Sequence, residues 1–177
     1  YGTFTGVFLF FGFYFQTLGN VYTTASRNGF ITQLNIIFVP YLYYLFFKRK
    51  VDIFNIISVL AAIVGLFVLT YDPGETGGGL LSYFSKINIG DFYTLICAVM
   101  VAFHVTTGSF YQKKYDFDPA AFVFINIASA GILSVIFMLV SEKLPTISLV
   151  HYWPLLFLAV FNTALGFLVQ SYALKIS

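Results

Sequence analysis

The chain has 177 residues, of which 59% are hydrophobic and only 9% are charged, with a formal net charge of +2. Its mean hydropathy of +0.88 lies outside the range of a soluble domain with a solvated surface. These values exclude an ordinary soluble domain and leave no basic patch large enough to bind nucleic acid. The composition therefore predicts a protein of the lipid bilayer.

Apolar stretches of about 18 to 25 residues separate the clusters of charge, and a helix of that length crosses the hydrocarbon core. Six such stretches follow in chain order: residues 1–18, 22–47, 53–71, 92–112, 119–141 and 152–174. Each stretch is apolar along its length and does not alternate between polar and apolar residues, which favours helices over barrel strands. We therefore predict an all-α polytopic membrane protein with six visible transmembrane helices.

Basic residues are distributed unevenly between the two sides of these spans. One side carries six of the nine: Lys48, Arg49, Lys50, Lys113, Lys114 and Lys175. The excess of Lys and Arg predicts that the loops at residues 48–52 and 113–118 are cytoplasmic. The Gly-rich connection at residues 72–90 is then extracytoplasmic, and Asp91 is expected to cap the helix that follows it.

The first and last spans share a short pattern. Gly12, Phe13 and Gln16 recur 154 positions later as Gly166, Phe167 and Gln170. The two copies lie five spans apart, so they cross the membrane in opposite directions, as in the inverted repeats of secondary transporters. We expect a ten-helix protein of two five-helix repeats, of which this chain is a piece: helices three to five in residues 1–71, a loop at 72–88, and helices six to eight in 89–177.

Polar residues inside the second span form a stripe. On a helical wheel Thr24, Asn28, Thr32 and Asn35 fall within an arc of about 80°. Such groups do not face hydrocarbon without cost, so we expect the stripe to face other helices or an aqueous cavity. Arg27 is expected to extend into the headgroup region rather than to contact a solute.

Pro40, further along the same span, lacks a backbone N–H and is expected to bend or loosen the helix near Ile36. The carbonyl that this exposes could serve a cavity, or the bend could be a packing kink. Both interpretations remain open.

His104 is the only ionisable residue deep within a predicted span, and it shares a helix face with Thr107. Such a residue could bind a polar solute, or it could only hydrogen-bond a neighbouring helix. Asn162 and Gln170 share a face on the last span, and Gln16 is their counterpart on the first. Helix packing remains the alternative explanation for these amides, although the pairing of Gln16 with Gln170 favours a shared central site.

Motifs of other membrane protein classes are absent from the sequence. There is no HExxH, no P-loop, and no Cys or His cluster, and the single Cys97 lies within a span. We therefore predict no enzyme, no metal site and no cofactor. No Arg-rich voltage-sensing helix or channel filter motif is present either.

Three stretches carry a family resemblance: TASRNGFITQLNIIFVP, NIGDFYTLICAVMVAFHVTTGSFYQKK and FNTALGFLVQSYALK. They resemble the EamA-type permeases of the drug/metabolite transporter superfamily. The resemblance implies an inner-membrane secondary transporter for small metabolites such as amino acids or amphipathic compounds, which works by alternating access. It also implies a substrate cavity near Gln16, Asn28, Thr32, Asn35, His104, Thr107, Asn162 and Gln170. A non-transporting membrane scaffold or assembly subunit is the alternative.

Overall fold

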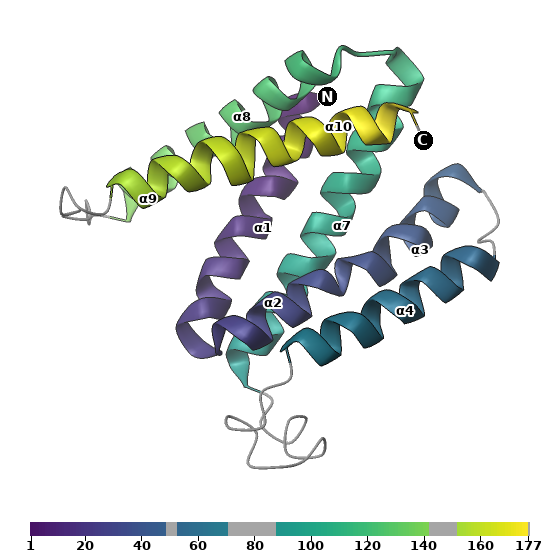
Figure 1. Cartoon of the computed structure of the whole chain (residues 1–177). Coiled ribbons are helices and arrows are strands. Elements are labelled where there is room, and N and C mark those ends of the chain that lie inside the picture. Colours follow the sequence, from purple (N-terminus) through teal and green to yellow (C-terminus); the bar gives the residue numbers. More distant parts are fainter. Residues whose placement is uncertain (49–52, 71–87, 142–151, 177) are drawn as a thin grey trace. The chain divides into compact units, whose positions relative to one another are not determined.

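The structure is a computed structural model of the chain, which describes residues 1–48, 53–70, 88–141 and 152–176 (Figure 1). Within these ranges every regular element is a helix, and no strand occurs. The predicted all-α fold is therefore confirmed. Most of the predicted cytoplasmic loop at 48–52 and of the predicted extracytoplasmic loop at 72–88 lies outside the described residues.

The helices begin and end close to the predicted boundaries. They are α1 (Gly2–Tyr22), α2 (Ala25–Gln33), α3 (Asn35–Phe47), α4 (Ile53–Thr70), α7 (Ile89–Tyr115), α8 (Pro119–Val140), α9 (Tyr152–Phe157), the π-helix η2 (Leu158–Leu165) and α10 (Gly166–Ile176).

Most of these helices are suited to a bilayer. Among the described residues, five segments are long and apolar enough to cross one: Gly2–Tyr22, Ala25–Phe46, Ile89–Tyr115, Pro119–Val140 and Tyr152–Lys175. Helix α4 adds an apolar helix of 18 residues where the third span is predicted. The chain is therefore an all-α polytopic membrane protein.

The chain divides into two compact units. Unit 1 consists of Tyr1–Phe10 and His104–Ser177, and unit 2 of Phe11–Phe103. The division falls within α1 and within α7, so each of these two helices has one part in unit 1 and the other part in unit 2. Within unit 1, α10 packs along α8, and within unit 2, α2 and α3 pack against α4 (Figure 1).

Short polar side chains cap the helices where the chain turns. The Thr24 hydroxyl accepts a hydrogen bond from the backbone N–H of Arg27, and the Asp118 carboxylate accepts one from Ala121. These bonds satisfy N–H groups that have no partner within the first turn of a helix. Thr24 therefore begins α2 as its cap, whereas the sequence pattern had placed it in the polar stripe of the helix body.

The predicted second span is interrupted near its middle. Helix α2 ends at Gln33 and α3 begins at Asn35, and the backbone N–H of Ile37 bonds to the carbonyl of Leu34 three residues back, at 2.9 Å. Pro40 lies within α3 and cannot donate to the carbonyl of Ile36. An irregularity is thus present in this span as predicted, but the break between the helices falls at Leu34, before Ile36.

The burial pattern is the reverse of a soluble protein. Thr5, Thr94 and Gln112 are among the most deeply buried side chains, whereas Phe124 and Trp153 are 74% and 78% exposed. Apolar side chains facing outward suit lipid, and polar side chains then need partners inside the protein. Polar residues are consequently the natural place to look for a functional site.

Candidate functional site

Two residues of the predicted polar stripe are buried in unit 2. The Asn28 side-chain amide donates to the backbone carbonyl of Gln16 at 3.0 Å, and the Thr32 hydroxyl donates to the Asn28 side-chain oxygen at 3.3 Å. These bonds connect α2 to α1, so the stripe faces a neighbouring helix. Asn35, at the start of α3, is only partly buried.

Arg27 does not extend freely towards the headgroups. Its guanidinium forms an ion pair with Asp91 of α7, with 2.6 Å between Nη2 and Oδ2, and the two side chains are only 11% and 6% exposed. The Thr23 hydroxyl donates to the same carboxylate at 2.7 Å. The predicted interfacial role of Arg27 is therefore wrong, because a buried counter-charge lies within reach.

Asp91 also stabilises the start of α7, as predicted, but from inside the helix. Its carboxylate accepts from the backbone N–H of Asn88, and the Asn88 side chain accepts from the backbone N–H of Asp91, both at 3.1 Å. This reciprocal pair is a capping box in which Asn88 is the cap. A negative charge in the first turn is also favoured by the helix dipole.

His104 belongs to a polar network in unit 1. Its Nδ1 is 3.2 Å from the backbone carbonyl oxygen of Thr5 on α1. The Thr5 hydroxyl donates to the carbonyl of Gly2 at 2.9 Å and accepts from the Asn126 side-chain amide of α8 at 3.0 Å. Three helices thus meet through one threonine, which is itself fully buried.

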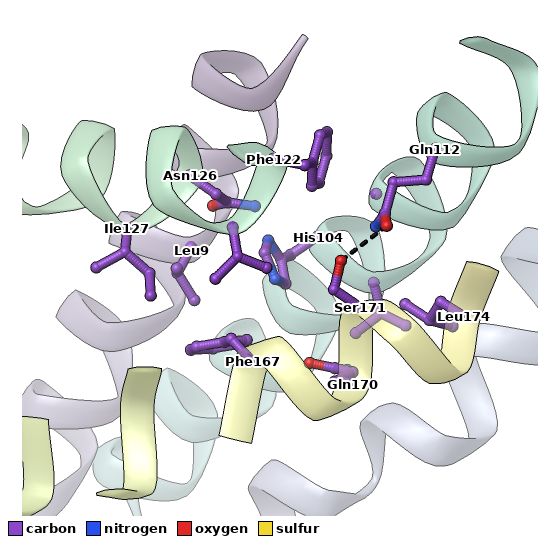
Figure 2. Close-up of a pocket in the computed structure, with 13 residues that line it drawn as sticks. Leu9, His104, Gln112, Phe122, Asn126, Ile127, Phe167, Gln170, Ser171 and Leu174 are labelled. Atoms are coloured by element: carbon purple, nitrogen blue, oxygen red, sulfur yellow. Dashed lines mark hydrogen bonds between the residues drawn. The ribbon is translucent and has the colours of Figure 1, made fainter. Parts of the chain in front are cut away.

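A small pocket opens beside this network (Figure 2). Its polar lining residues are His104, Gln112, Asn126, Gln170 and Ser171, and its apolar lining includes Leu9, Phe122 and Phe167. The rings of His104 and Phe167 meet edge to face with 5.5 Å between their centroids. Among the described residues that line the pocket, none carries a charged side chain.

One fully buried polar atom of the pocket lining has no hydrogen-bond partner among the described residues. The Asn126 side chain is 4% exposed, and its Oδ1 makes no hydrogen bond within the described part of the chain. A buried polar atom left unpaired costs about 1–3 kcal/mol. The pocket has about 20 Å³ of space for the centre of a water-sized group, which is enough for one such group, but the Asn126 Oδ1 itself is inaccessible to water.

At the other end of the pocket, two polar side chains of the lining hydrogen-bond to each other. The Ser171 hydroxyl of α10 donates to the Gln112 side-chain oxygen of α7 at 2.7 Å, which Figure 2 shows as a dashed line. Beyond the pocket, Lys175 forms an ion pair with Asp116 at 2.8 Å. Its Nζ also donates to the carbonyl of Phe117 at 3.3 Å. These contacts hold the end of α10 against the turn between α7 and α8.

The pocket brings together two of the predicted site residues, His104 and Gln170. Thr107 is buried one turn along α7, where its hydroxyl donates to the backbone carbonyl of His104. Asn162 is exposed and lies in η2. The π-helix turns the chain by a different angle per residue than an α-helix, so a face drawn on a continuous α-helix does not carry through from Asn162 to Gln170.

The sequence pattern did not single out four polar residues of this site: Thr5, Gln112, Asn126 and Ser171. Their common signal is a polar side chain within an apolar run, which is weak for Thr and Ser because their hydroxyls often bond to their own helix.

Comparisons with known proteins agree on a membrane transporter family. A family model described as the EamA-like transporter family matches residues 88–177. An uncharacterized transporter of Archaeoglobus fulgidus is 29% identical over 167 residues, which are 94% of this chain and 50% of that protein. The chain thus spans about half the length of this curated relative. No solved structure matches the chain.

Proposed function

Because the chain belongs to the EamA-like transporter family, we propose that the full-length protein is a secondary transporter of small metabolites. Amino acids and small amphipathic compounds are the solute classes that we expect, carried across the cytoplasmic membrane by alternating access between two repeats. The curated relative is itself described as a transporter. In this proposal the loops at residues 48–52 and 113–118 face the cytoplasm.

The pocket in unit 1 carries the proposal. Polar groups within membrane helices are costly, and they are retained where they bind a solute or satisfy one another. The pocket offers an imidazole, amides and a hydroxyl between phenyl and aliphatic walls. This arrangement suits a solute with one polar end and one apolar end.

His104 and Gln170 are the first candidates for solute contact, because both line the pocket. We add Gln112, Asn126 and Ser171 to these candidates, because they line the same pocket. The other predicted contacts remain part of the proposal for the complete cavity: Gln16, Asn28, Thr32, Asn35, Thr107 and Asn162.

A membrane scaffold is the second candidate function. It is favoured by the bond from Asn28 to the carbonyl of Gln16 and by the bond from Thr32 to Asn28, since these polar groups already satisfy one another. In a scaffold the amides would serve helix packing alone. The two functions differ in whether the intact protein moves a solute.

Flux through the full-length protein in proteoliposomes separates the two. A panel of amino acids, nucleosides and cationic dyes is offered to the wild type and to the variants Gln170→Leu and Ser134→Ala. We expect flux of at least one solute, its loss in Gln170→Leu without loss of folding, and its retention in Ser134→Ala, whose hydroxyl bonds only within α8. A folded protein that moves none of these solutes would support the scaffold.

A further inference from the structure

A cluster of aromatic rings lies at one end of unit 1, away from the residues that line the pocket. The ring of Tyr1 packs against those of Tyr111 and Tyr115, with 4.5 and 4.8 Å between the ring centroids. Tyr115 in turn packs against Phe117 at 5.7 Å. Tyr1 and Tyr115 are 57% and 42% exposed, so the cluster forms part of the surface of the protein.

Three membrane-spanning segments begin or end at this cluster. The span Gly2–Tyr22 begins directly after Tyr1, the span Ile89–Tyr115 ends at Tyr115, and the span Pro119–Val140 begins four residues later. The ends of spans mark the boundary between hydrocarbon and water, where tyrosine is favoured because its ring is apolar and its hydroxyl is polar. The cluster therefore lies at the level of the lipid headgroups, on the predicted cytoplasmic side.

The hydroxyls of Tyr1 and Tyr115 leave one hydrogen unused. They share a single hydrogen bond, with 3.2 Å between the two oxygen atoms. Each hydroxyl carries one hydrogen, and the bond uses only one of the two, whichever residue donates. The remaining hydrogen has no acceptor among the described residues. An acceptor in the headgroup layer can take it.

Lys114 brings a positive charge to the same ring. Its Nζ lies 5.4 Å from the ring centroid of Tyr115 and 5.3 Å from that of Phe110. Both distances are within the range of cation–π attraction, which holds the ammonium near the exposed tyrosine pair. The charge and the unused hydroxyl hydrogen thus belong to one small region of the surface.

The neighbouring carboxylates do not neutralise this charge. Asp116 is paired with Lys175, with 2.8 Å between Oδ1 and Nζ. Asp118 caps α8 by accepting a backbone N–H. Within the described parts of the chain, neither carboxylate forms an ion pair with Lys114. Lys113 adds a second positive charge to the same turn of α7.

We propose that Lys114 and the Tyr1–Tyr115 pair form a binding site for the phosphate of an anionic phospholipid. The ammonium compensates the charge of the phosphate, and the unused hydroxyl hydrogen bonds to one of its oxygens. The rings of the cluster provide apolar surface for the part of the lipid below the phosphate. Anionic lipids are supplied by the cytoplasmic leaflet, which attracts basic residues next to a span. The site does not depend on transport.

The position of Lys114 disfavours a zwitterionic headgroup. Choline and ethanolamine headgroups carry a cation beside the phosphate, and such a cation binds to the faces of aromatic rings. Lys114 already lies over the rings of Tyr115 and Phe110, so it repels a second cation there. Phosphatidylglycerol carries no cation, and we therefore expect the site to prefer it to phosphatidylcholine.

Lipid titrations of the purified full-length protein in dodecyl maltoside micelles test the site. The protein carries 3-fluorotyrosine, and the ¹⁹F signal of Tyr111 is identified with the variant Tyr111→Phe. Tyr111 is a suitable reporter because its ring packs against Tyr1 but its hydroxyl has no part in the proposed bonds. The probes are dioleoylphosphatidylglycerol, dioleoylphosphatidylcholine and inorganic phosphate.

We expect phosphatidylglycerol to shift this signal at a concentration about fivefold lower than phosphatidylcholine, which is the effect of one lysine at an anionic surface. Inorganic phosphate at the same concentrations should leave the signal unchanged, since it lacks the part of the lipid that contacts the rings. Equal titration by the two lipids, or no shift with either, would overturn the proposal. A shift with inorganic phosphate equal to that with phosphatidylglycerol would also overturn it, in favour of a site for free phosphate.

Variants test the two parts of the site separately. Lys114→Gln should reduce the preference for phosphatidylglycerol towards one, and Lys114→Arg should retain it because the charge remains. Lys48→Gln, at the end of α3 on the same predicted side, is the control and should also retain it. The double variant Tyr1→Phe with Tyr115→Phe should weaken phosphatidylglycerol binding about three- to tenfold, as the loss of one hydrogen bond predicts.

An unchanged preference in folded Lys114→Gln, or an equal loss in Lys48→Gln, would refute the role of Lys114. Unchanged binding in the double tyrosine variant would refute the role of the hydroxyl pair. The comparison of the two lipids on the wild type decides the matter if a variant does not fold. None of these titrations measures flux, so a protein that moves no solute can still confirm the lipid site, and a transporter without lipid preference would lose only this inference.

Discussion

The ion pair between Arg27 and Asp91 gives a quantitative prediction for the stability of unit 2. The replacement Arg27→Met retains the length and packing of the side chain but removes its charge. Asp91→Asn retains the shape and one acceptor oxygen but removes the opposite charge. A double-mutant cycle with these two changes isolates the interaction between them.

The geometry sets the expected size of the effect. The side chains are 11% and 6% exposed, and Asp91 receives two hydrogen bonds from Arg27, at 3.3 Å to Oδ1 and 2.6 Å to Oδ2. Leaving one partner of a buried pair unpaired costs about 3–5 kcal/mol. We expect about 3 kcal/mol for Arg27→Met, because Thr23 and the Asn88 N–H still bond to the carboxylate and reduce the penalty.

Asp91→Asn should cost about 2 kcal/mol, since the amide can still accept from Thr23. In the double variant neither charge is left uncompensated, so its loss should fall short of the sum by about 1.5–2 kcal/mol. Reversible unfolding of the full-length protein in mixed micelles measures all four free energies.

Additive losses, with a coupling below about 0.5 kcal/mol, would refute the reasoning. So would a neutral Arg27→Met variant, which is the result expected if Arg27 extended into the headgroups.

The remaining predictions concern packing and pH. A Cβ at Gly90 would lie 2.8 Å from the backbone N of Thr23, so Gly90→Ala should lower the free energy of unfolding by about 1–3 kcal/mol. Gly131→Ala, with nothing within 4 Å, should not lower it; equal losses in the two variants would contradict the close approach at Gly90. The hydrogen bond and charge of Lys175 lower the pKa of the Asp116 carboxyl below its ordinary value of 3.8. The resulting stabilisation is complete above pH 3.8 and is lost as the pH falls through the folded-state pKa. The Asp116 pKa should rise in Lys175→Met, and an unchanged titration by nuclear magnetic resonance would show that the pair is absent.

The fold was predictable because its cause is local. A bilayer span needs a certain number of apolar residues, and charged or capping residues delimit it. Pro119 at the start of α8 and Asn88 before α7 therefore lie where a polar stretch of sequence gives way to an apolar one. The π-helix η2 had no such signal, and it altered the face on which Asn162 was expected.

The site was predictable only in part, because its partners lie far apart in the sequence. His104 was recognisable by itself as an ionisable residue within an apolar span. Its partner Thr5 lies 99 residues away, and Asn126 lies 121 residues from Thr5. Arg27 was misinterpreted for the same reason, since 64 residues separate it from Asp91.

The exposure of the His104 pocket to water tests the account most directly. A single cysteine in place of Gln170, in a cysteine-free full-length protein in native membranes, is treated with a membrane-impermeant thiol reagent. We predict that Gln170→Cys reacts and that a transported solute slows the reaction, whereas Ser134→Cys on the exposed face of α8 does not react. Complete protection of Gln170→Cys from both sides of the membrane, in a protein that still folds, would contradict the account.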